Sequence, residues 1–187
     1  MTIGIDVSQI AYGNTGVSNY LSNLVREMVR NDKHEYVLFF SSLRRKFPIS
    51  SAKMADQISN SKVKLKRFKF PPLVLDLLWN KLHIFPIEWF VGDVDWFITS
   101  DWTEPPARRA KKATIIYDLI VYKYPEETDQ KIVSVQKRKL KWVKKESDIV
   151  FCISKSSKKD AVEILGIDES RVHVVYPGIS TVNELTG

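Results

Sequence analysis

Short apolar runs alternate with amphipathic stretches along most of the chain. Seven runs have the length and the β-branched and aromatic content of strands, and they lie at 2–7, 35–40, 62–68, 94–99, 113–118, 148–153 and 171–176. Several are apolar at almost every position, which is typical of strands that are buried on both faces of a parallel sheet. The pattern therefore predicts a sheet that is covered on both sides.

Helical patterns separate several of these strands. The first predicted helix has an inward face at i, i+3, i+4 spacing, formed by Val17, Tyr20, Leu21, Leu24, Val25 and Met28. A second pattern lies within 153–167, with Ser154 or Ser157 as N-cap, Asp160 in the first turn and Gly166 as C-cap. Strands alternating with helices predict an α/β fold, a Rossmann-like, doubly wound and mostly parallel sheet with helices on both faces.

The chain has the size of one such domain. Its 187 residues are 44% hydrophobic, enough for a substantial core. Pro177 and Gly178 end the last strand, and no periodic pattern follows them. We therefore predict a domain over residues 1–178 and the beginning of a linker over 179–187.

Charge and cysteine content narrow the class of protein. The net charge of +7 suggests an anionic partner, but no RNA-recognition or helix-turn-helix signature accompanies it, so we expect no nucleic-acid partner. The single cysteine, Cys152, lies in an apolar run and cannot form a disulfide within the chain, which fits the cytoplasm. The N-terminal residues are predicted to be a strand and not a signal peptide. The most apolar stretch, 70–90, is interrupted by polar residues, so we expect no spanning helix.

The loop between the first strand and the first helix contains two glycines, in the sequence "GNTG" at 13–16. Such a loop can direct backbone N–H groups at a phosphate, or it can be a plain turn. The G-x-G-x-x-G pattern of dinucleotide binding is absent, and no Walker lysine follows. The spacing thus argues against NAD binding and against an ordinary nucleotide triphosphatase. It does not decide between a phosphate-contacting loop and a plain turn.

Three segments in order resemble retaining glycosyltransferases of family 4, also called group 1. They are "IGIDVSQIAYGNTGVSNYLSNLVREM" (3–28), "GDVDWFITSDWTEPPARRAKKATIIYDLIVYKYPE" (92–126) and "SDIVFCISKSSKKDAVEILGIDESRVHVVYPGIS" (147–180). The resemblance implies the N-terminal, acceptor-side half of a two-domain GT-B enzyme whose C-terminal nucleotide-sugar domain is absent here. It implies transfer of a hexosyl unit from a nucleotide-diphosphate sugar to an acceptor hydroxyl, with retention and without a metal or other cofactor, in glycan or polysaccharide biosynthesis. The isolated chain is expected to be inactive.

The resemblance also implies site residues at two positions. Thr15, Gly16 and Val17 match the loop whose backbone approaches the donor diphosphate. Tyr117 and Asp118 occupy the place where family members usually carry His-Asp, which contacts the transferred sugar. A tyrosine hydroxyl can bond a sugar, but its pKa near 10 makes it a poor proton shuttle at neutral pH. The alternative is that Tyr117 is a partly buried aromatic and Asp118 caps the next turn.

A third candidate group follows the strand at 94–99. Ser100, Asp101 and Trp102 can line an acceptor pocket, with the indole as a flat surface for a sugar, or they can form a polar loop closed by two prolines. In the family a Ser-Glu pair is common near residue 154. Here Ser154 matches and Lys155 replaces the acid, and we expect Ser154 to be a helix cap.

Two further interpretations concern partners. The basic amphipathic helix at 130–145, with Val133, Leu140 and Val143 inward, can join 62–70 and 71–79 in holding the enzyme to the inner face of an anionic membrane, near a lipid-linked acceptor. The alternative is a solvated helix face. A metal site is not expected, because the histidines are scattered at His34, His83 and His173.

The loss of the usual histidine favours a competing function. A chain with Tyr117 in that place and no partner domain can be a non-catalytic Rossmann-like binding or scaffold module.

Overall fold

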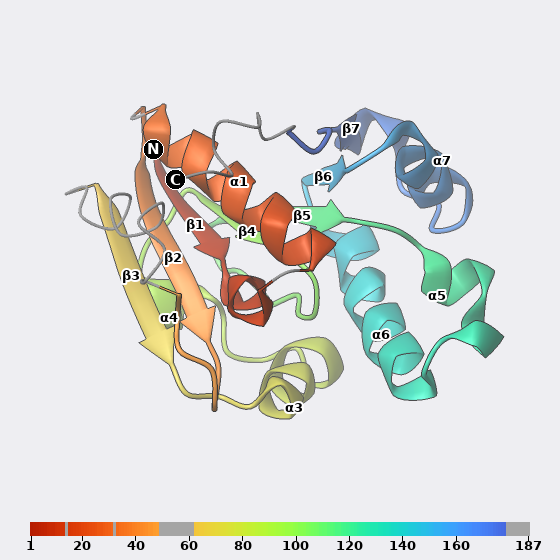
Figure 1. Ribbon diagram of the computed structural model, residues 1–187, viewed down its shortest axis with the longest axis horizontal. Coiled ribbons are helices and arrows are strands. Elements are labelled where there is room, and N and C mark those ends of the chain that lie inside the picture. The colour runs from red at the N-terminus through yellow and green to blue at the C-terminus, as the bar shows by residue number, and fades with distance from the viewer. Residues whose placement is uncertain (14, 32, 49–61, 179–187) are drawn as a thin grey trace.

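The computed structural model describes residues 1–13, 15–31, 33–48 and 62–178, and within them seven strands form one parallel sheet (Figure 1). The strands are β1 (Thr2–Asp6), β2 (Glu35–Ser41), β3 (Val63–Phe68), β4 (Trp96–Thr99), β5 (Lys111–Ile116), β6 (Ile149–Cys152) and β7 (Val172–Val174). All seven predicted strands are present, and their ends differ from the predicted ones by at most two residues. The predicted linker, 179–187, lies outside the described residues.

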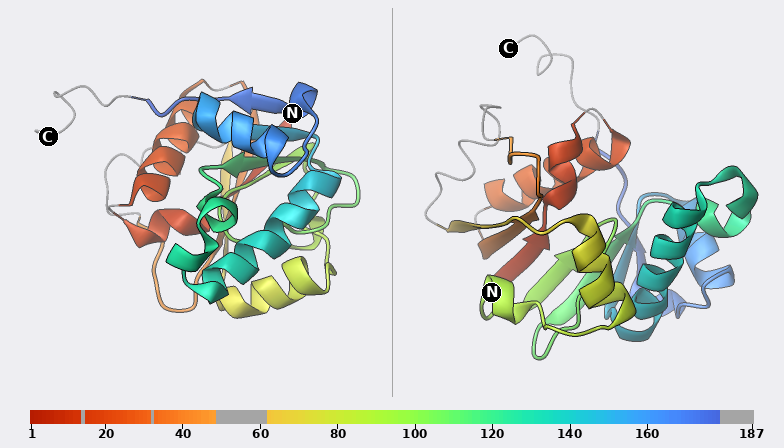
Figure 2. Two further views of the ribbon diagram at one scale, coloured as in Figure 1. Left: turned by 90° about the vertical axis from the view of Figure 1, so that its right-hand side faces the viewer. Right: turned by 90° about the horizontal axis from the view of Figure 1, so that it is seen from below.

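Helices cover both faces of this sheet (Figure 2). The described helices are η1 (Ser8–Tyr12), α1 (Gly16–Arg30), α3 (Pro72–Leu75), η2 (Asp76–Lys81), α4 (Glu88–Val91), α5 (Ile120–Lys123), η3 (Pro125–Glu127), α6 (Gln130–Glu146), α7 (Lys155–Glu163) and η4 (Glu169–Arg171). Of these, α1 packs on one face, while α3, η2, α4, α6 and α7 pack on the other. The doubly wound α/β fold is therefore confirmed.

The strand order is β3-β2-β1-β4-β5-β6-β7, so the strands that follow β1 lie first on one side of it (β2, β3) and then on the other (β4 to β7). We call the boundary between β1 and β4 the reversal. In such sheets the loops on either side of the reversal diverge, and ligands bind in the crevice beyond the carboxyl ends of the strands. At this point Gly4 of β1 lies between Val37 of β2 and Phe97 of β4. A Cβ on Gly4 would lie 2.6 Å from Phe97 Cδ2, so a glycine is required for the two strands to pack around that ring.

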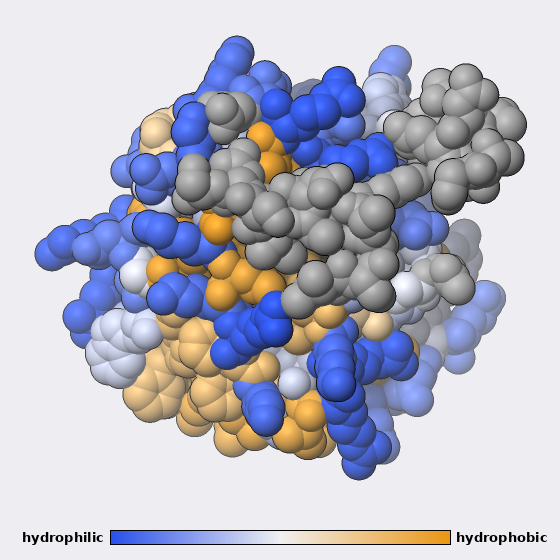
Figure 3. Space-filling model, turned by 60° about the vertical axis from the view of Figure 1, so that its left-hand side comes forward, coloured by the Kyte–Doolittle hydropathy of each residue, from blue (hydrophilic) through white to orange (hydrophobic). Residues whose placement is uncertain are grey.

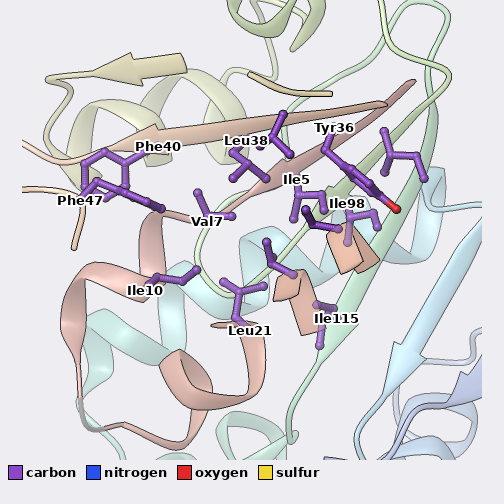
Figure 4. Close-up of a cluster of buried hydrophobic side chains, with 14 of the residues drawn as sticks. Ile5, Val7, Ile10, Leu21, Tyr36, Leu38, Phe40, Phe47, Ile98 and Ile115 are labelled. Carbon is purple, nitrogen blue, oxygen red and sulfur yellow. The ribbon is translucent and has the colours of Figure 1, made fainter. Parts of the chain in front are cut away.

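The core has a separate part on each face of the sheet. Under α1, side chains such as Leu21 and Val25 pack on Ile5 and Leu38 (Figure 4). On the opposite face Trp79 of η2 packs in an aromatic cluster with Phe39, and its ring centroid lies 5.5 Å from that of Phe39. These two layers fix the strand ends that carry the polar residues of the cavity described below.

The two most clearly predicted helices are present, with corrections at the second. The α1 helix buries Tyr20, Leu21 and Val25, as predicted, and the remaining predicted positions are half-buried. For α7 the N-cap is Ser154, whose Oγ accepts from Ser157 N at 3.0 Å. Because the helix begins that early, Asp160 is not in its first turn but a turn later, where it pairs with Lys123 at 3.1 Å.

The predicted C-cap of α7 is also displaced. The helix ends at Glu163 with Ile164 as C-cap, and Gly166 follows two residues later with a left-handed φ of +64°. Its N–H still bonds to Val162 O at 3.0 Å, the arrangement in which helix C-termini favour glycine.

The η2 segment is a π-helix, in which Leu82 N bonds to Leu77 O at 2.9 Å. The wider turn directs Asp76 and Asn80 inward toward α6, and both are buried. Single π turns are uncommon and occur often at functional sites. No helix within the described ranges has the length and apolar content that crossing a bilayer requires.

Candidate active site

A cavity of about 480 Å³ opens at the carboxyl edge of the sheet, beside the reversal between β1 and β4. Its size falls within the about 300–1,000 Å³ typical of small-molecule sites. Its walls come from η1, the start of α1, α3, the loop after β4 and the first half of α6. The lining residues are Asp6, Ser8, Gln9, Tyr12, Thr15, Val17, Ser41, Pro72, Leu73, Leu75, Asp76, Asp101, Trp102, Thr103, Lys131, Ile132 and Val135.

The glycine loop forms one rim of this cavity. Thr15 is the N-cap of α1, where its Oγ1 accepts from Ser18 N at 3.1 Å, and Thr15 and Val17 line the cavity. Gly16 opens the helix, and among the described residues no atom beyond its chain neighbours and its own helix backbone lies within 4 Å of the position that a Cβ would take there. Gly16 does not have a left-handed φ, so backbone conformation does not require a glycine. The space above this helix N-terminus is open to a ligand.

Asp6, at the carboxyl end of β1, is a buried acid of the cavity, with 8% of its surface exposed. Its Oδ1 accepts from Ser8 N at 2.9 Å. Burial raises the pKa of the Asp6 carboxyl above its ordinary value, although the hydrogen bonds from Ser8 and the charge of Lys139 oppose the change. The sequence pattern predicted only that this residue ends a strand, because the sequence around it does not indicate which residues surround it in the fold.

Asp101 and Trp102, two of the three residues proposed from the sequence for an acceptor pocket, line the cavity from the loop after β4. The side-chain amide of Gln136 donates to both Oδ1 and the main-chain oxygen of Asp101, each at 3.0 Å. Burial raises the pKa of Asp101, while the charge of Lys139 lowers it. The third residue, Ser100, is 1% exposed and lies behind the cavity wall.

Lys139 of α6 is a buried cation beneath these two acids. It is 2% exposed, and its Nζ donates to Ser100 O. Burial lowers the pKa of Lys139, and the charges of Glu104, Asp101 and Asp6 act in the opposite direction. The helix at 130–145 was predicted to bury Val133, Leu140 and Val143, which it does; it also buries Lys139, for which the sequence pattern made no prediction.

Tyr117 and Asp118 follow β5 and do not line the cavity. The Tyr117 hydroxyl lies 3.0 Å from Ser100 Oγ, and its ring meets that of Tyr20 edge-on at 5.6 Å. Burial raises the pKa of Tyr117, so the hydroxyl keeps its proton at neutral pH. Asp118 is exposed, and its Oδ1 accepts from Ile120 N at 3.1 Å at the start of α5.

Ser157 joins α7 to this strand end. Its Oγ donates to Tyr117 O at 2.8 Å and lies 3.0 Å from Ser154 Oγ. Ser154 is thus a helix cap, as expected from the sequence, while Lys155 is exposed at the helix start.

A buried polar network supports the wall formed by η2 and α6. Arg138 donates to both oxygens of Asp76, at 3.3 and 2.6 Å. The amide of Asn80 donates to Asp76 Oδ1 and to Trp102 O, and its oxygen accepts from Glu104 N at 3.0 Å. These contacts hold Trp102 in the wall. Sequence spacing contained no signal for them, because they join segments far apart in the chain.

The described part of the chain contains no group of three or more histidine, cysteine or acidic side chains arranged to hold a metal ion. His83 is instead enclosed by protein contacts. Its ring stacks on Trp142 at 3.5 Å, Nδ1 lies 2.8 Å from Trp79 O, and Nε2 lies 2.9 Å from Glu146 Oε2. That the protein works without a metal remains a prediction.

An exposed apolar surface extends from the cavity mouth over α3, η2 and α4. Figure 3, in which the left-hand side of Figure 1 comes forward, shows apolar residues gathered low on this side with hydrophilic ones around them. Between residues 73 and 89, the exposed apolar side chains are Leu73, Val74, Leu77, Leu82, Ile84, Phe85 and Trp89. We call these seven residues the apolar ridge. Arg108 lies over the Trp89 ring at 5.3 Å, which places a cation at the ridge.

The structure is an α/β domain of the doubly wound class with a cavity at its switch point, the place where such folds bind ligands. The chain belongs to glycosyltransferase family 4, whose model matches residues 14–183. Its fold is also similar to the crystal structure of a glycosyltransferase from Rickettsia africae ESF-5, with a TM-score of 0.50 and 14% identity. That match covers 98% of this chain and 47% of the Rickettsia chain, so this chain spans about half of that protein. No curated protein matches the chain.

Proposed function

We propose that the chain is the N-terminal, acceptor-side half of a two-domain GT-B enzyme. The enzyme transfers a hexosyl unit from a nucleotide-diphosphate sugar to an acceptor hydroxyl, with retention, in glycan or polysaccharide biosynthesis. The observation that carries the proposal is the cavity at the strand reversal, where the open N-terminus of α1 faces the acids and the indole of the loop after β4. In this proposal transfer also requires a donor-binding domain, so the isolated chain is inactive.

The open loop gives this domain its part in donor binding. Backbone N–H groups at a helix N-terminus favour an anion, and the space at Gly16 lets a diphosphate approach without meeting a side chain. Thr15 and Val17 flank that point. As the glycosidic bond breaks, negative charge grows on the leaving diphosphate, and donors already directed at it stabilise the transition state.

The other wall positions the acceptor. In this proposal Asp101 accepts a hydrogen bond from an acceptor hydroxyl, and Trp102 presents its ring to the sugar. Ser100 acts from behind the wall, by holding the Tyr117 hydroxyl. Tyr117 reaches the transferred sugar through that hydroxyl as a hydrogen-bond donor, and Asp118 orients the strand end through Ile120 N. Holding the two reactants in line supplies much of the rate enhancement, and no metal is required.

The apolar ridge suggests a location for the enzyme. Exposed aliphatic and aromatic side chains beside cations favour contact with an anionic bilayer, and in this proposal the domain rests on the cytoplasmic face of the membrane. Cosedimentation with phosphatidylglycerol vesicles tests this contact. Trp89→Asp should reduce binding, whereas Tyr176→Asp should not, since Tyr176 is equally exposed, at 58% against 59%, but lies outside the ridge.

A non-catalytic binding module is the second candidate. It is favoured by one observation, that the Tyr117 hydroxyl is already bonded to Ser100 and does not line the cavity. In that case ligands would bind the cavity without transfer.

Gly16→Val in the full-length protein separates the two candidates. The valine would occupy the open space at the helix N-terminus, so transfer from nucleotide sugars should be lost while the melting temperature changes little. Asn19→Val introduces the same side chain at an exposed position of the same helix and should leave transfer intact. An active Gly16→Val enzyme would overturn the assignment of this loop to the donor, and a wild-type protein without transfer would favour the binding module.

A further inference from the structure

The cavity has a polar floor and an apolar wall. The floor carries the carboxylates of Asp6 and Asp101, which line the cavity, with Asp6 Oδ1 accepting from Ser8 N and Asp101 Oδ1 accepting from Gln136 Nε2. Carboxylate oxygens accept hydrogen bonds from hydroxyls. The floor is therefore suited to a hydroxyl-bearing group.

The wall is aliphatic and lies between two helices at the carboxyl edge, α3 and α6 (Figures 1 and 2). Pro72, Leu73 and Leu75 line it from α3, and Ile132 and Val135 line it from α6. These side chains offer no hydrogen-bond partner to a sugar hydroxyl, and a hydroxyl buried against them would lose its water without compensation. A chain of methylene groups would gain about 0.8 kcal/mol for each group buried.

The mouth of the cavity is apolar as well. Leu73 is 79% exposed and Ile132 is 39% exposed, so each contributes both to the cavity and to the outer surface. Beyond Leu73 the apolar ridge continues through Val74 and Leu77. A chain longer than the cavity thus has an apolar path on leaving it.

We infer that the acceptor is amphipathic, with a hydroxyl-bearing head group on the Asp6 and Asp101 floor and one aliphatic chain between α3 and α6. The inference rests on the proposed function and names its acceptor class. A free, unmodified sugar would leave the aliphatic wall uncovered. In this arrangement Asp6 and Asp101 bind the head, whereas Leu73 and Ile132 select for the chain.

Pairs of glycosides that differ only in chain length test this arrangement. Octyl and methyl glycosides of glucose, galactose and mannose would be titrated into the 187-residue chain below the micelle concentration, with amide NMR shifts as readout. Burial of only two methylene groups gives more than a tenfold preference for the octyl member, at about 0.8 kcal/mol each. The shifts should concentrate at Asp101, Trp102 and Ile132.

Matched variants assign the preference to the wall. Leu73→Asp and Ile132→Asp should each remove the octyl preference. Leu43→Asp and Ile164→Asp should keep it, because those residues are exposed aliphatics, at 54% and 40%, outside the cavity. Asp6→Asn and Asp101→Asn should weaken both members of a pair by similar factors and leave their ratio unchanged.

Several results would overturn the inference. Equal affinity for octyl and methyl glycosides, binding of neither, or shifts located away from the cavity would each do so. The proposed function is judged separately, by transfer in the full-length protein. Transfer without an octyl preference removes the acceptor class and keeps the enzyme, whereas an octyl preference without transfer keeps the amphipathic site and removes the enzyme.

Discussion

Two buried lysines on the same side of the sheet are used in different ways. Lys112 of β5 is 4% exposed and forms ion pairs with Glu104 at 3.0 Å and Glu146 at 3.2 Å. Lys139 of α6 is 2% exposed and donates to a main-chain oxygen, and its charge interacts with Glu104 and with the two cavity acids Asp101 and Asp6. One charge is neutralised inside the core. The charge of Lys139 instead acts on Asp6 and Asp101, the two acids of the cavity floor.

The partners of Glu104 show how complete the first arrangement is. Its Oε1 meets Lys112 and also accepts from Ser147 Oγ at 3.3 Å, and its Oε2 accepts from Thr99 Oγ1 at 2.5 Å. A buried ion pair contributes little net stability over apolar residues, but the removal of one member leaves an uncompensated charge. The network should therefore be sensitive to single substitutions, and the cavity floor much less so.

Lys112→Met should have the largest effect on stability. It leaves the fully buried Glu104 without its cation, and we expect a loss of about 3–5 kcal/mol in the free energy of unfolding. Urea unfolding of the 187-residue chain measures this loss. Lys111→Met, at the adjacent exposed position, is the matched control and should cost less than about 0.5 kcal/mol. Equal losses in the two variants would mean that the network is not what stabilises this region.

Lys139→Met should have a smaller effect on the free energy of unfolding and a larger effect on the pKa values of the cavity acids. The substitution removes a desolvated charge that forms no direct ion pair with the described residues, so we expect a loss below about 2 kcal/mol. Because the charge of Lys139 lowers the pKa of both Asp6 and Asp101, each pKa should rise further in the variant. Carboxyl carbon NMR titration of the two aspartates measures this. Lys141→Met, exposed on the same helix, should leave both values unchanged.

The seven strands, the sheet and the α1 helix could be predicted because their signal is local and repeats along the chain. The cavity could be predicted in part, since Asp101, Trp102 and the Thr15 loop lie at strand ends that a parallel sheet brings to one edge. Asp6 and Lys139 could not be predicted as cavity residues, because what marks them is the interaction between their charges in the folded chain. Their burial is a property of the folded chain that no residue spacing records. The requirement for Gly4 is of the same kind, since it depends on the Phe97 ring of another strand.

The two regions should respond to pH with opposite signs. Burial raises the pKa of Glu146, but the hydrogen bond from His83 and the charge of Lys112 lower it by a larger amount, so the net pKa is below its ordinary value of 4.5. Its contribution to stability is therefore present above pH 4.5 and lost as the pH falls through the folded value. The pKa of Asp6 is raised above 3.8, so its contribution is present below pH 3.8 and lost as the pH rises through its folded value.

Two isosteric variants measure these signs. Glu146→Gln should lower the free energy of unfolding at pH 7 by about 1.5–3 kcal/mol, the usual contribution of hydrogen bonds to a charged group, and change it little at pH 3. Asp6→Asn should raise it at pH 7 by a smaller amount and change it little at pH 3. Urea unfolding at several pH values records both curves. Parallel curves for the two variants would contradict the comparison.

The smallest effect on stability is expected at the hydroxyl pair of Ser100 and Tyr117. Tyr117→Phe and Ser100→Ala remove the same 3.0 Å hydrogen bond, and each should cost about 0.5–1.5 kcal/mol. Their effects on transfer in the full-length protein should differ. If the Tyr117 hydroxyl donates to the transferred sugar, Tyr117→Phe lowers kcat by about tenfold, equivalent to about 1.4 kcal/mol. Ser100→Ala keeps the Tyr117 hydroxyl but removes the contact that holds it, so kcat should fall by less than in Tyr117→Phe. Equal transfer rates in the two variants would show that Tyr117 only packs at the strand end, and the cavity acids would then be the part of this domain that acts on the acceptor.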